Sequence, residues 1–483
     1  MKNTFRTILL CTFLAIAHAC RPGTEAELYV TTADQSMIFQ QFTPASGQAT
    51  NDNPIIQLNP RERYQTMDGF GAAMTGSSCY NLLRMTPENR AKLLQETFHP
   101  ETGMGYSYIR ISIGCSDFSL DEYTCCDQEG IENFVIHDYD KRDLLPILKE
   151  ILAINPEIKI LATPWTCPTW MKVNNLQDRQ PFKSWTSGQL NPAYYQDYAT
   201  YFVKYIQAME REGIPIHAIT IQNEPLNKGN SASLFMTWQE QRDFIKTALG
   251  PAFKKAGLNT QIIAYDHNYD YDAHKPECKD QIGYPAHLYT DADAARYITG
   301  TAYHAYGGDK EEMMRLHQAY PEKGLYFTEI SIGLWGNGYT FADDLMWNMR
   351  EVCIGTINRF CKAVIMWNFM LDEKHSPYRP GGCNICLGAI DIQSSDYATM
   401  TRNSHYYTMG HLSKVIKPGA TRIGVTDIGI PGVYYSAFEN PDGSLAVVLQ
   451  NDTEQEQTIT LRGKNRTLTY THPPKSVASY RWR

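Results

Sequence analysis

The sequence predicts a (β/α)8 barrel, a TIM barrel, with an appended antiparallel β-sandwich built from both chain ends. Three observations favour this fold class. Eight apolar, strand-like segments alternate with helical segments between Asn59 and His405, the order typical of a parallel barrel. Short strand-like segments at close spacing follow His405, as in a sandwich. Two more strand-like segments precede the barrel, so both chain ends can contribute to the sandwich.

The expected barrel strands are continuous apolar runs, which suits strands that are buried on both faces of a parallel sheet. A doubly wound open sheet is the structural alternative, but eight strand–helix pairs fit barrel closure better. The expected strands are 67–74, 106–114, 159–165, 218–225, 261–268, 301–308, 324–330 and 363–370.

Helical signals lie between these strands. Thr86 offers an N-cap, Pro87 suits the first helical position, and an amphipathic run follows over 88–98. Residues 192–213 keep apolar side chains at helical spacing and end at a glycine. Both segments are therefore expected to be helices of the outer ring.

The expected sandwich strands come from both ends of the chain, and residues 40–53 are expected to form a polar loop. The strands are 27–35, 55–60, 420–426, 433–440, 444–452, 456–463 and 466–472. The domain prediction is a signal peptide at 1–19, an N-terminal sandwich segment at 20–62, the barrel at 63–405 and the C-terminal sandwich at 406–483.

The first twenty residues have the pattern of an export signal. Lys2 and Arg6 precede an apolar stretch over 8–17 that is too short to span a bilayer comfortably. An Ala-His-Ala cleavage pattern over 17–19 is followed directly by Cys20, a placement that resembles a bacterial lipoprotein signal. We expect an exported protein that is lipid-anchored through Cys20, on the periplasmic side or at the cell surface, or otherwise secreted or periplasmic.

Composition narrows the function classes. The net charge is −8 and there is no long basic run, which argues against nucleic-acid binding. Aromatic residues make up 12% of the chain, which suits a partly apolar, flat ligand such as a sugar as well as a large core. Cys383 and Cys386 have no second Cys/His pair at zinc-finger distance, so a loop disulfide or free thiols are favoured over a metal site.

Two carboxylic acids, Glu224 and Glu329, follow the fourth and seventh expected strands. In a barrel the chemistry gathers at the carboxyl ends of the strands, and two acids across one barrel mouth suit glycoside hydrolysis. Further candidate side chains at these ends are Arg110, Asp117, Trp165, Asn223, His304, Tyr306 and Trp367.

Motifs in order along nearly the whole chain resemble glycoside hydrolase family 30, which contains glucosylceramidases and β-1,6-glucanases. The resemblance implies a retaining enzyme with Glu224 as acid/base and Glu329 as nucleophile, and a mechanism that needs no metal or cofactor. The matching stretches are 68-DGFGAAMT-75, 109-IRISIGCSDFS-119, 163-TPWTCPTWMK-172, 220-TIQNEP-225, 303-YHAYGG-308, 327-FTEIS-331, 366-MWNF-369 and 406-YYTMGHLSKVIKPG-419.

The physical roles expected of the other candidates follow. Glu224 must start protonated, and Arg110 or the Tyr306 hydroxyl can stabilise an ionised Glu329. Asn223 can hydrogen-bond the sugar 2-hydroxyl, an interaction that strengthens at the transition state. By resemblance, Asp117 and Trp165 bind outer hydroxyls and Trp367 forms the platform under the reacting sugar. His304 either contacts the sugar or holds Glu329 and its loop.

The first choice of substrate is a β-1,6-linked glucan, because an exported bacterial enzyme meets polysaccharide more often than glucosylceramide. A glucosylceramidase-like exo-β-glucosidase is the alternative, with a β-xylosidase or fucosidase behind it. From another class, a non-catalytic carbohydrate-binding protein is disfavoured, because such a relative would normally lack Glu224, Glu329 or Asn223. The expected partner is thus a polysaccharide or oligosaccharide.

Overall fold

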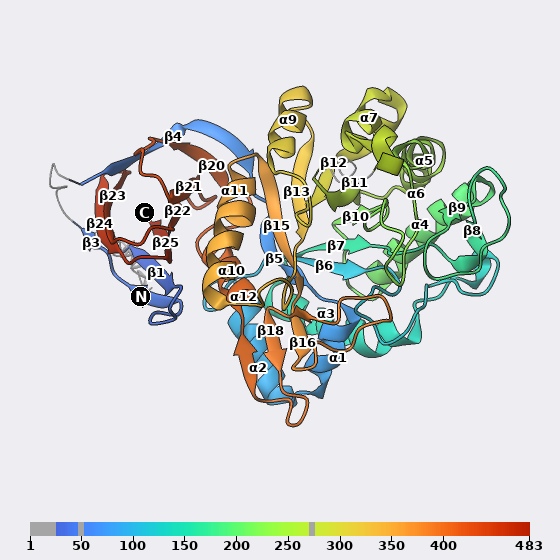
Figure 1. Ribbon diagram of the computed structural model, residues 1–483, viewed down its shortest axis with the longest axis horizontal. Coiled ribbons are helices and arrows are strands. Elements are labelled where there is room, and N and C mark those ends of the chain that lie inside the picture. The colour runs from blue at the N-terminus through green and yellow to red at the C-terminus, as the bar shows by residue number, and fades with distance from the viewer. Residues whose placement is uncertain (1–25, 47–52, 270–275) are drawn as a thin grey trace, which may run out of the picture.

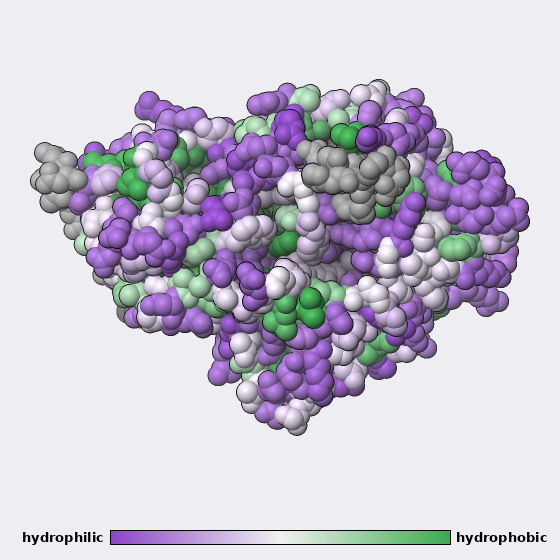
Figure 2. Space-filling view, in the orientation of Figure 1, coloured by the Kyte–Doolittle hydropathy of each residue, from purple (hydrophilic) through white to green (hydrophobic). Residues whose placement is uncertain are grey.

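The computed structural model describes residues 26–46, 53–269 and 276–483, and Figure 1 shows a barrel beside a sandwich. The predicted export signal and Cys20 lie outside the described residues. Within the described residues no helix combines the length and apolar character needed to cross a bilayer. The face seen in Figure 2 is mostly hydrophilic, and its apolar side chains form small groups.

The barrel is closed by eight parallel strands, and every predicted barrel strand is confirmed. Its strands are β5 (Gly69–Ala73), β6 (Tyr108–Ser112), β7 (Lys159–Thr163), β10 (Ala218–Thr220), β11 (Gln261–Asn268), β12 (Ile298–His304), β13 (Gly324–Glu329) and β15 (Cys361–Asn368). The alternative of a doubly wound open sheet is thereby excluded, since β15 pairs with β5 and closes the ring.

Apolar side chains fill the lower part of the barrel interior. Tyr108, Leu161, Ile263 and Tyr326 belong to one buried cluster there. This filled layer makes the barrel a packed core and not a channel. Polar side chains therefore collect at the other end of the strands, where the carboxyl ends and their loops lie.

Helices surround the barrel, as the sequence predicts. In α2 the Thr86 side chain accepts a hydrogen bond from the Asn89 backbone at 3.3 Å, and Pro87 occupies the first turn. The predicted helix over 192–213 begins with a 3₁₀ turn, Pro192–Tyr194, and continues as α4. The α-helices are α1 (Gly76–Arg84), α2 (Pro87–Phe98), α3 (Leu145–Ile154), α4 (Tyr195–Arg211), α5 (Trp238–Phe244), α6 (Gly250–Ala256), α7 (Tyr284–Thr290), α8 (Ala292–Ala295), α9 (Glu311–Ala319), α10 (Phe341–Trp347), α11 (Ile354–Ile357) and α12 (Ser404–Ser413).

The sandwich takes strands from both chain ends, in the order β2-β1-β25-β22-β21-β20-β4-β23-β24-β3. All neighbours but one pair antiparallel, the exception being the parallel pair β23 and β4. The strands are β1 (Glu27–Thr32), β2 (Gln40–Phe42), β3 (Ala45–Ser46), β4 (Ile55–Thr66), β20 (Thr421–Val425), β21 (Val433–Glu439), β22 (Leu445–Asn451), β23 (Gln457–Gly463), β24 (Arg466–His472) and β25 (Ser476–Trp482).

Two features of the sandwich differ from the sequence prediction. The segment 40–53 is not wholly loop, because β2 and β3 lie within it and pair with β1 and β24. The last strand, β25, has no counterpart among the predicted strands, yet it lies between β1 and β22. Ser479 and Arg481 alternate with Ala478, Tyr480 and Trp482, a strand signal that the prediction did not use.

Helix α12 joins the two parts of the molecule. Its His411 is buried, and the two ring nitrogens lie 2.8 Å from Ser479 Oγ on β25 and 2.8 Å from Thr31 Oγ1 on β1. Burial lowers the pKa of His411 to about 3, so the ring is neutral and acts as a fixed polar link. The first and last long strands are therefore tied to the same helix.

Candidate active site

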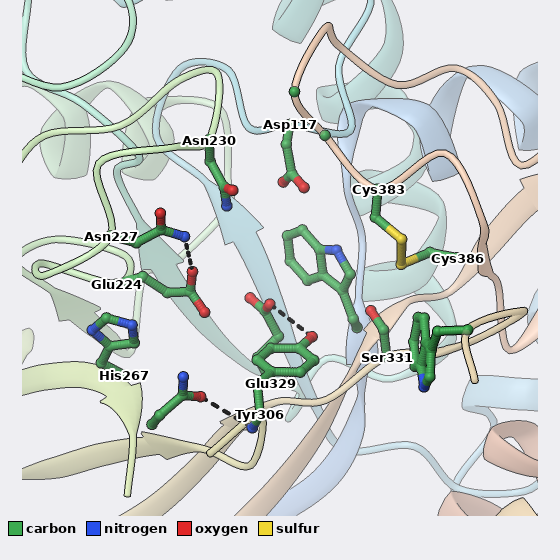
Figure 3. Close-up of a pocket in the computed structure, with 15 residues that line it drawn as sticks. Asp117, Glu224, Asn227, Asn230, His267, Tyr306, Glu329, Ser331, Cys383 and Cys386 are labelled. Carbon is green, nitrogen blue, oxygen red and sulfur yellow. Dashed lines mark hydrogen bonds between the residues drawn. A yellow bond between two sulfur atoms is a disulfide. The ribbon is translucent and has the colours of Figure 1, made fainter. Parts of the chain in front are cut away.

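The candidate site is a cavity of about 530 Å³ at the carboxyl ends of the barrel strands (Figure 3). Its lining includes the two predicted acids, Glu224 and Glu329, together with Asp117, Tyr306 and Trp367. The sequence prediction therefore located the correct end of the barrel, where loops of different strands converge.

Glu224 and Glu329 face each other across this cavity. Glu329 is the last residue of β13, and Glu224 lies in the loop that follows β10. One carboxylate oxygen of each lies within 4.8 Å of the other. Retaining glycosidases have their two carboxyl groups about 5–5.5 Å apart, whereas inverting enzymes need about 6.5–9.5 Å to admit a water. The spacing matches the retaining class.

The backbone around Glu224 is held in a conformation that L-residues seldom adopt. Glu224 has φ of 45°, and Tyr265 and Asp266 on the neighbouring strand have φ of 71° and 72°. The register between β11 and β12 shifts between Tyr265 and His267, and the Glu224 N–H donates to the Asp266 carbonyl at 2.9 Å. Bulges and left-handed residues of this kind re-aim side chains at functional sites.

Arg110 on β6 lies beneath the cavity and is fully buried. Its guanidinium donates to Glu329 at 2.5 Å, to Asn223 Oδ1 at 2.7 Å and to Asp266 at 2.8 Å. The prediction that Arg110 supports Glu329 agrees with this contact. Because its fork is fully engaged by protein groups, Arg110 positions other side chains and does not itself line the cavity.

Asn223 has one end of its amide fixed by Arg110. The Oδ1 atom accepts from the guanidinium, so the amide N–H groups point elsewhere. Asn223 is not among the residues that line the cavity, so its contact with the sugar 2-hydroxyl stays a prediction.

Asp266 is a buried carboxylate that the sequence prediction missed. It accepts hydrogen bonds from Thr220 at 2.7 Å and from Thr328 at 2.6 Å, in addition to the contact with Arg110. Burial alone would raise its pKa, but the Arg110 charge and the His304 hydrogen bond lower it below the ordinary range. Asp266 is thus a permanent negative charge under the site. The sequence signal for this residue was a single acidic side chain within the strand-like segment 261–268.

His304 lies between two carboxylates, and its side chain is completely buried. Its Nδ1 is 3.1 Å from Glu224 and its Nε2 is 3.0 Å from Asp266. Burial alone would lower its pKa, but the Glu329 charge and the bonds to Asp266 and Glu224 raise it to about 9. Its ring nitrogens face Glu224 at the cavity wall and Asp266 beneath it, so they are not directed at a sugar. The predicted support of Glu329 agrees with the His304 charge, which opposes the effect of burial on the pKa of Glu329, and support of Glu224 is added to it.

The proton distribution differs from the expectation that Glu224 starts protonated. Burial opposes its ionisation, but the His304 hydrogen bond and the nearby His267 charge lower the pKa of Glu224 to about 2. The pKa of Glu224 is lowered and that of His304 is raised, so both shifts favour the shared proton on the His304 side of the contact. Because the two groups share one short contact, the pair titrates as a unit.

Glu329 experiences opposing influences. Burial and the Glu224 charge raise its pKa above the ordinary value, while His304 and Arg110 act in the opposite direction. Its two oxygens accept from Arg110 and from the Tyr306 hydroxyl at 3.1 Å. Both donors stabilise the ionised form of Glu329, as the sequence prediction expected of Arg110 and Tyr306.

Asp117 points into the cavity from the loop after β6 (Figure 3). Burial, and then the charges of Glu329 and Glu224, raise the pKa of Asp117 well above its usual value. A carboxyl group in that state can both donate to and accept from a sugar hydroxyl. The position suits the predicted contact with outer hydroxyls.

The two tryptophans predicted for sugar binding lie in different places. Trp367 lines the cavity, whereas Trp165 is 1% exposed and stacks on Trp367 with ring centroids 5.2 Å apart. In this structure Trp165 therefore supports the back of Trp367 and does not line the cavity. A direct sugar contact of Trp165 is replaced by support of the predicted platform.

Several lining residues have no place in the sequence prediction. Asn227 donates to Glu224 at 2.7 Å, and Asn268 accepts from the Tyr306 backbone at 3.0 Å. The others are Asn230, His267, Ser331, Trp335, Gly381, Gly382, Cys383 and Cys386. The lining residues of the loops 227–230 and 381–383 lie well past the preceding strands, and such loops give no positional signal in one sequence. His267 and Asn268 end β11, a strand-end position that the prediction did not use.

Cys383 and Cys386 form a disulfide at the edge of the cavity. This agrees with the predicted preference for a loop disulfide or thiols over a metal site. Cys386 begins β17 (Cys386–Leu387), which pairs with β14 (Ile332–Gly333) directly after Glu329. The disulfide therefore closes a loop onto the ribbon that follows the nucleophile candidate.

Glu224, His304 and Glu329 also offer three ligand atoms within 4.8 Å of one another, a spacing that a cation could use. A histidine must be deprotonated to bind a metal. Because the pKa of His304 is raised to about 9, its ring carries a proton at neutral pH. The donor set fits proton transfer better than metal binding.

Comparison with known proteins adds independent findings. The family model for the Glycosyl hydrolase family 30 TIM-barrel domain matches residues 67–416, and the model for the family 30 beta sandwich domain matches residues 419–480. The endo-beta1,6-glucanase BT3312, a solved structure, matches with a TM-score of 0.92 and 57% identity, covering 95% of this chain and 99% of that chain.

Two curated relatives carry different activities in their names. Endo-1,6-beta-D-glucanase BGN16.3 of Trichoderma harzianum is 31% identical over 411 residues, which are 80% of this chain and 78% of the relative. Lysosomal acid glucosylceramidase of Mus musculus is 26% identical over 466 residues, which are 90% of this chain and 84% of the relative. The resemblance derived from the motifs is confirmed.

Proposed function

Because the chain belongs to glycosyl hydrolase family 30, we propose that it hydrolyses β-1,6-linked glucan and retains the configuration of the anomeric carbon. The separation of Glu224 and Glu329, within 4.8 Å, carries the proposal for the mechanism. The 57% identity over nearly the whole chain to an endo-β1,6-glucanase supports the proposal for the substrate.

In the first step Glu329 attacks the anomeric carbon, and the bond from that carbon to the leaving oxygen breaks. The leaving oxygen takes the proton held by the Glu224–His304 pair, through Glu224, which lines the cavity. Arg110 and Tyr306 hold the two Glu329 oxygens during the attack. Trp367 supports the ring, and Asn223 donates to its 2-hydroxyl.

In the second step a water attacks the same carbon, Glu329 leaves as a carboxylate, and the water proton returns to Glu224 and His304. Esterification of Glu329 removes the negative charge that contributes most to raising the pKa of His304. The pair gave up its proton in the first step, and the loss of the Glu329 charge keeps Glu224 ionised in the intermediate, so Glu224 can act as the base. The same pair thus serves both steps.

A glucosylceramidase-like exo-β-glucosidase is the second candidate. The 26% identity to lysosomal acid glucosylceramidase over 90% of this chain is the observation that favours it. A closed pocket would suit cleavage from a chain end, whereas the proposed glucanase activity cuts within a chain. Product lengths distinguish the two.

The proposal is tested by incubating the leaderless protein with a β-1,6-glucan and measuring reducing ends, product lengths and the anomer released first. We expect short oligosaccharides, released initially as the β-anomer, and no turnover for Glu329→Gln. The matched control is Glu322→Gln, at a surface acid that follows α9. Release of glucose alone would support the exo-glucosidase. Binding without turnover would support the carbohydrate-binding class.

We also propose that the chain is exported and lipidated at Cys20. The positive residues, the apolar stretch and the Ala-His-Ala-Cys pattern over 17–20 support this proposal. In a bacterial host, labelled fatty acid should enter the wild type and not Cys20→Ser. Equal labelling of both would contradict it.

A further inference from the structure

An exposed tryptophan stands at the edge of the cavity and has no role in the mechanism above. Trp335 lines the cavity, and 44% of the residue is exposed. A large aromatic side chain usually gains stability by burial, so one held half-exposed beside an active site indicates a binding role. Leu334 and Ile385 next to it are 46% and 37% exposed.

The indole of Trp335 is held by the ribbon beneath it. A Cβ atom on Gly333 would lie 2.3 Å from a ring carbon of Trp335 and 2.6 Å from the Ile385 carbonyl. The ring therefore packs directly over the bare glycine. Gly333 pairs with Cys386, and the Leu334 N–H donates to the Ile385 carbonyl at 2.9 Å. The platform is thus fixed on its lower side and open above.

The loop on the other strand of the ribbon is also anchored. The Cys383–Cys386 disulfide closes it, the Arg379 N–H donates to the Asp117 carbonyl at 2.7 Å, and Gly382 packs against Asp117. Trp335 is therefore linked through this loop to Asp117, which points into the cavity. An aromatic face in fixed register with the reacting sugar is what recognition of a second sugar requires.

Polar groups line the same cavity as Trp335. They include Ser331, Asn230 and Asp117. No hydrogen bond joins the Asn230 amide to another side chain among the described residues, and Figure 3 shows this amide directed into the cavity. A sugar has apolar ring faces and polar edges, so an aromatic face with nearby amide and hydroxyl groups matches a sugar better than a lipid chain.

From this geometry we propose that Trp335 is a specificity-determining residue that stacks on the sugar next to the reacting one. The inference rests on the proposed function, because it takes the neighbouring unit to be a glucose of the same β-1,6-linked chain. Trp367 serves the reacting sugar, and Trp335, on the ribbon after β13, serves its neighbour. The enzyme thereby selects a chain over a single glucoside.

The test compares two substrates that differ in the neighbouring unit. One is a β-1,6-linked glucose oligosaccharide, and the other is β-glucosyl fluoride, whose leaving group is a single atom and cannot reach Trp335. Trp335→Ala should lower kcat/KM for the oligosaccharide about tenfold and leave that for the fluoride within about twofold. Trp335→Phe should restore most of the loss, since it keeps an aromatic face.

Trp347→Ala is the matched control, because Trp347 is 37% exposed and does not line this cavity. This variant should leave kcat/KM unchanged for both substrates. Equal loss on both substrates for Trp335→Ala, or no loss on either, would overturn the subsite while leaving the proposed function intact. A larger loss on octyl β-glucoside than on the oligosaccharide would overturn it in favour of an apolar leaving group. Wild type that cleaves the fluoride and not the oligosaccharide would refute the proposed substrate itself, and the inference with it.

Discussion

The Nδ1 atom of His304 lies 3.1 Å from a carboxylate oxygen of Glu224. This contact makes the two residues one proton-binding unit, since the ring is buried and its other nitrogen faces Asp266. Asp266 is ionised and offsets the positive charge of the ring. The acidity of the site therefore depends on a residue that does not reach the substrate.

Replacement of His304 by Gln should move the basic limb of the pH profile. For the wild type, kcat/KM should fall as pH rises through about 9, where His304 loses its proton. In His304→Gln only Glu224 can hold that proton, so the fall should occur at lower pH. Profiles of both proteins on one substrate measure the shift. A uniform loss of rate with an unmoved limb would assign His304 a structural role only.

The same raised pKa makes stability depend on pH. A folded-state pKa above the unfolded value of 6.5 contributes stability that is complete below pH 6.5 and lost as pH rises through about 9. The Tm of the wild type should fall over this interval more steeply than that of His304→Gln. Calorimetry across the interval measures the difference, and parallel curves would contradict it.

Asp117→Asn should stabilise the protein at neutral pH while reducing activity. The pKa of Asp117 is raised, so its ionisation costs stability at every pH above the unfolded value near 3.9. The variant removes this cost and should raise Tm at pH 7 but not near pH 3, where both states bind the proton. Asp121→Asn, at a side chain that is 55% exposed, is the control. A lower Tm at pH 7 would show that Asp117 contributes to folding.

Arg110→Met should lower stability strongly, because it leaves Asp266 and Glu329 without their buried partner. Breaking a buried ion pair on one side costs about 3–5 kcal/mol, and denaturant unfolding measures it. The double variant Arg110→Met/Asp266→Asn should recover part of that loss. The control Arg63→Met removes an ion pair to Glu439 at a side chain that is 51% exposed, worth about 0–1 kcal/mol. Equal losses for both single variants would contradict the assignment.

Removing the disulfide should weaken action on chains more than action on small substrates. In Cys383→Ser/Cys386→Ser the loop is no longer closed onto β17, so the ribbon under Trp335 becomes less fixed. We expect a lower kcat/KM on β-1,6-glucan and little change on β-glucosyl fluoride. Reductant should reproduce this in the wild type and have no further effect on the variant, since the free cysteines whose burial the structure describes are all buried. Identical activity of reduced and oxidised protein would exclude a positioning role.

Much of the fold follows from sequence because strong local patterns and global topology agree. Continuous apolar runs predicted all eight barrel strands, and a barrel brings the ends of strands four and seven to one mouth, which located Glu224 and Glu329. Arg110 was found in the same way. These residues lie on or directly beside strands, where position in the sequence fixes position in space.

Other parts of the site depend on packing that one sequence does not display. The bulge at Asp266 places the side chain of a strand residue under the cavity, and no residue type in the sequence predicts this bulge. Trp335 and the disulfide lie in loops whose path depends on the pairing of β14 with β17. Trp165 packs behind Trp367, and the sequence does not show which of the two tryptophans faces the cavity.

The pairing of β1 with β25 has a consequence for folding. Leu28 lies opposite Tyr480, so two strands that pair are separated in sequence by the whole barrel. Contacts between residues so far apart in sequence form slowly. Until β25 pairs with β1, the unpaired peptide groups of β1 form an open edge on which chains can aggregate. The barrel strands lie between β1 and β25 in sequence and can pair before the chain ends meet. The sandwich should therefore be the last part to complete, and the part most open to aggregation while it forms.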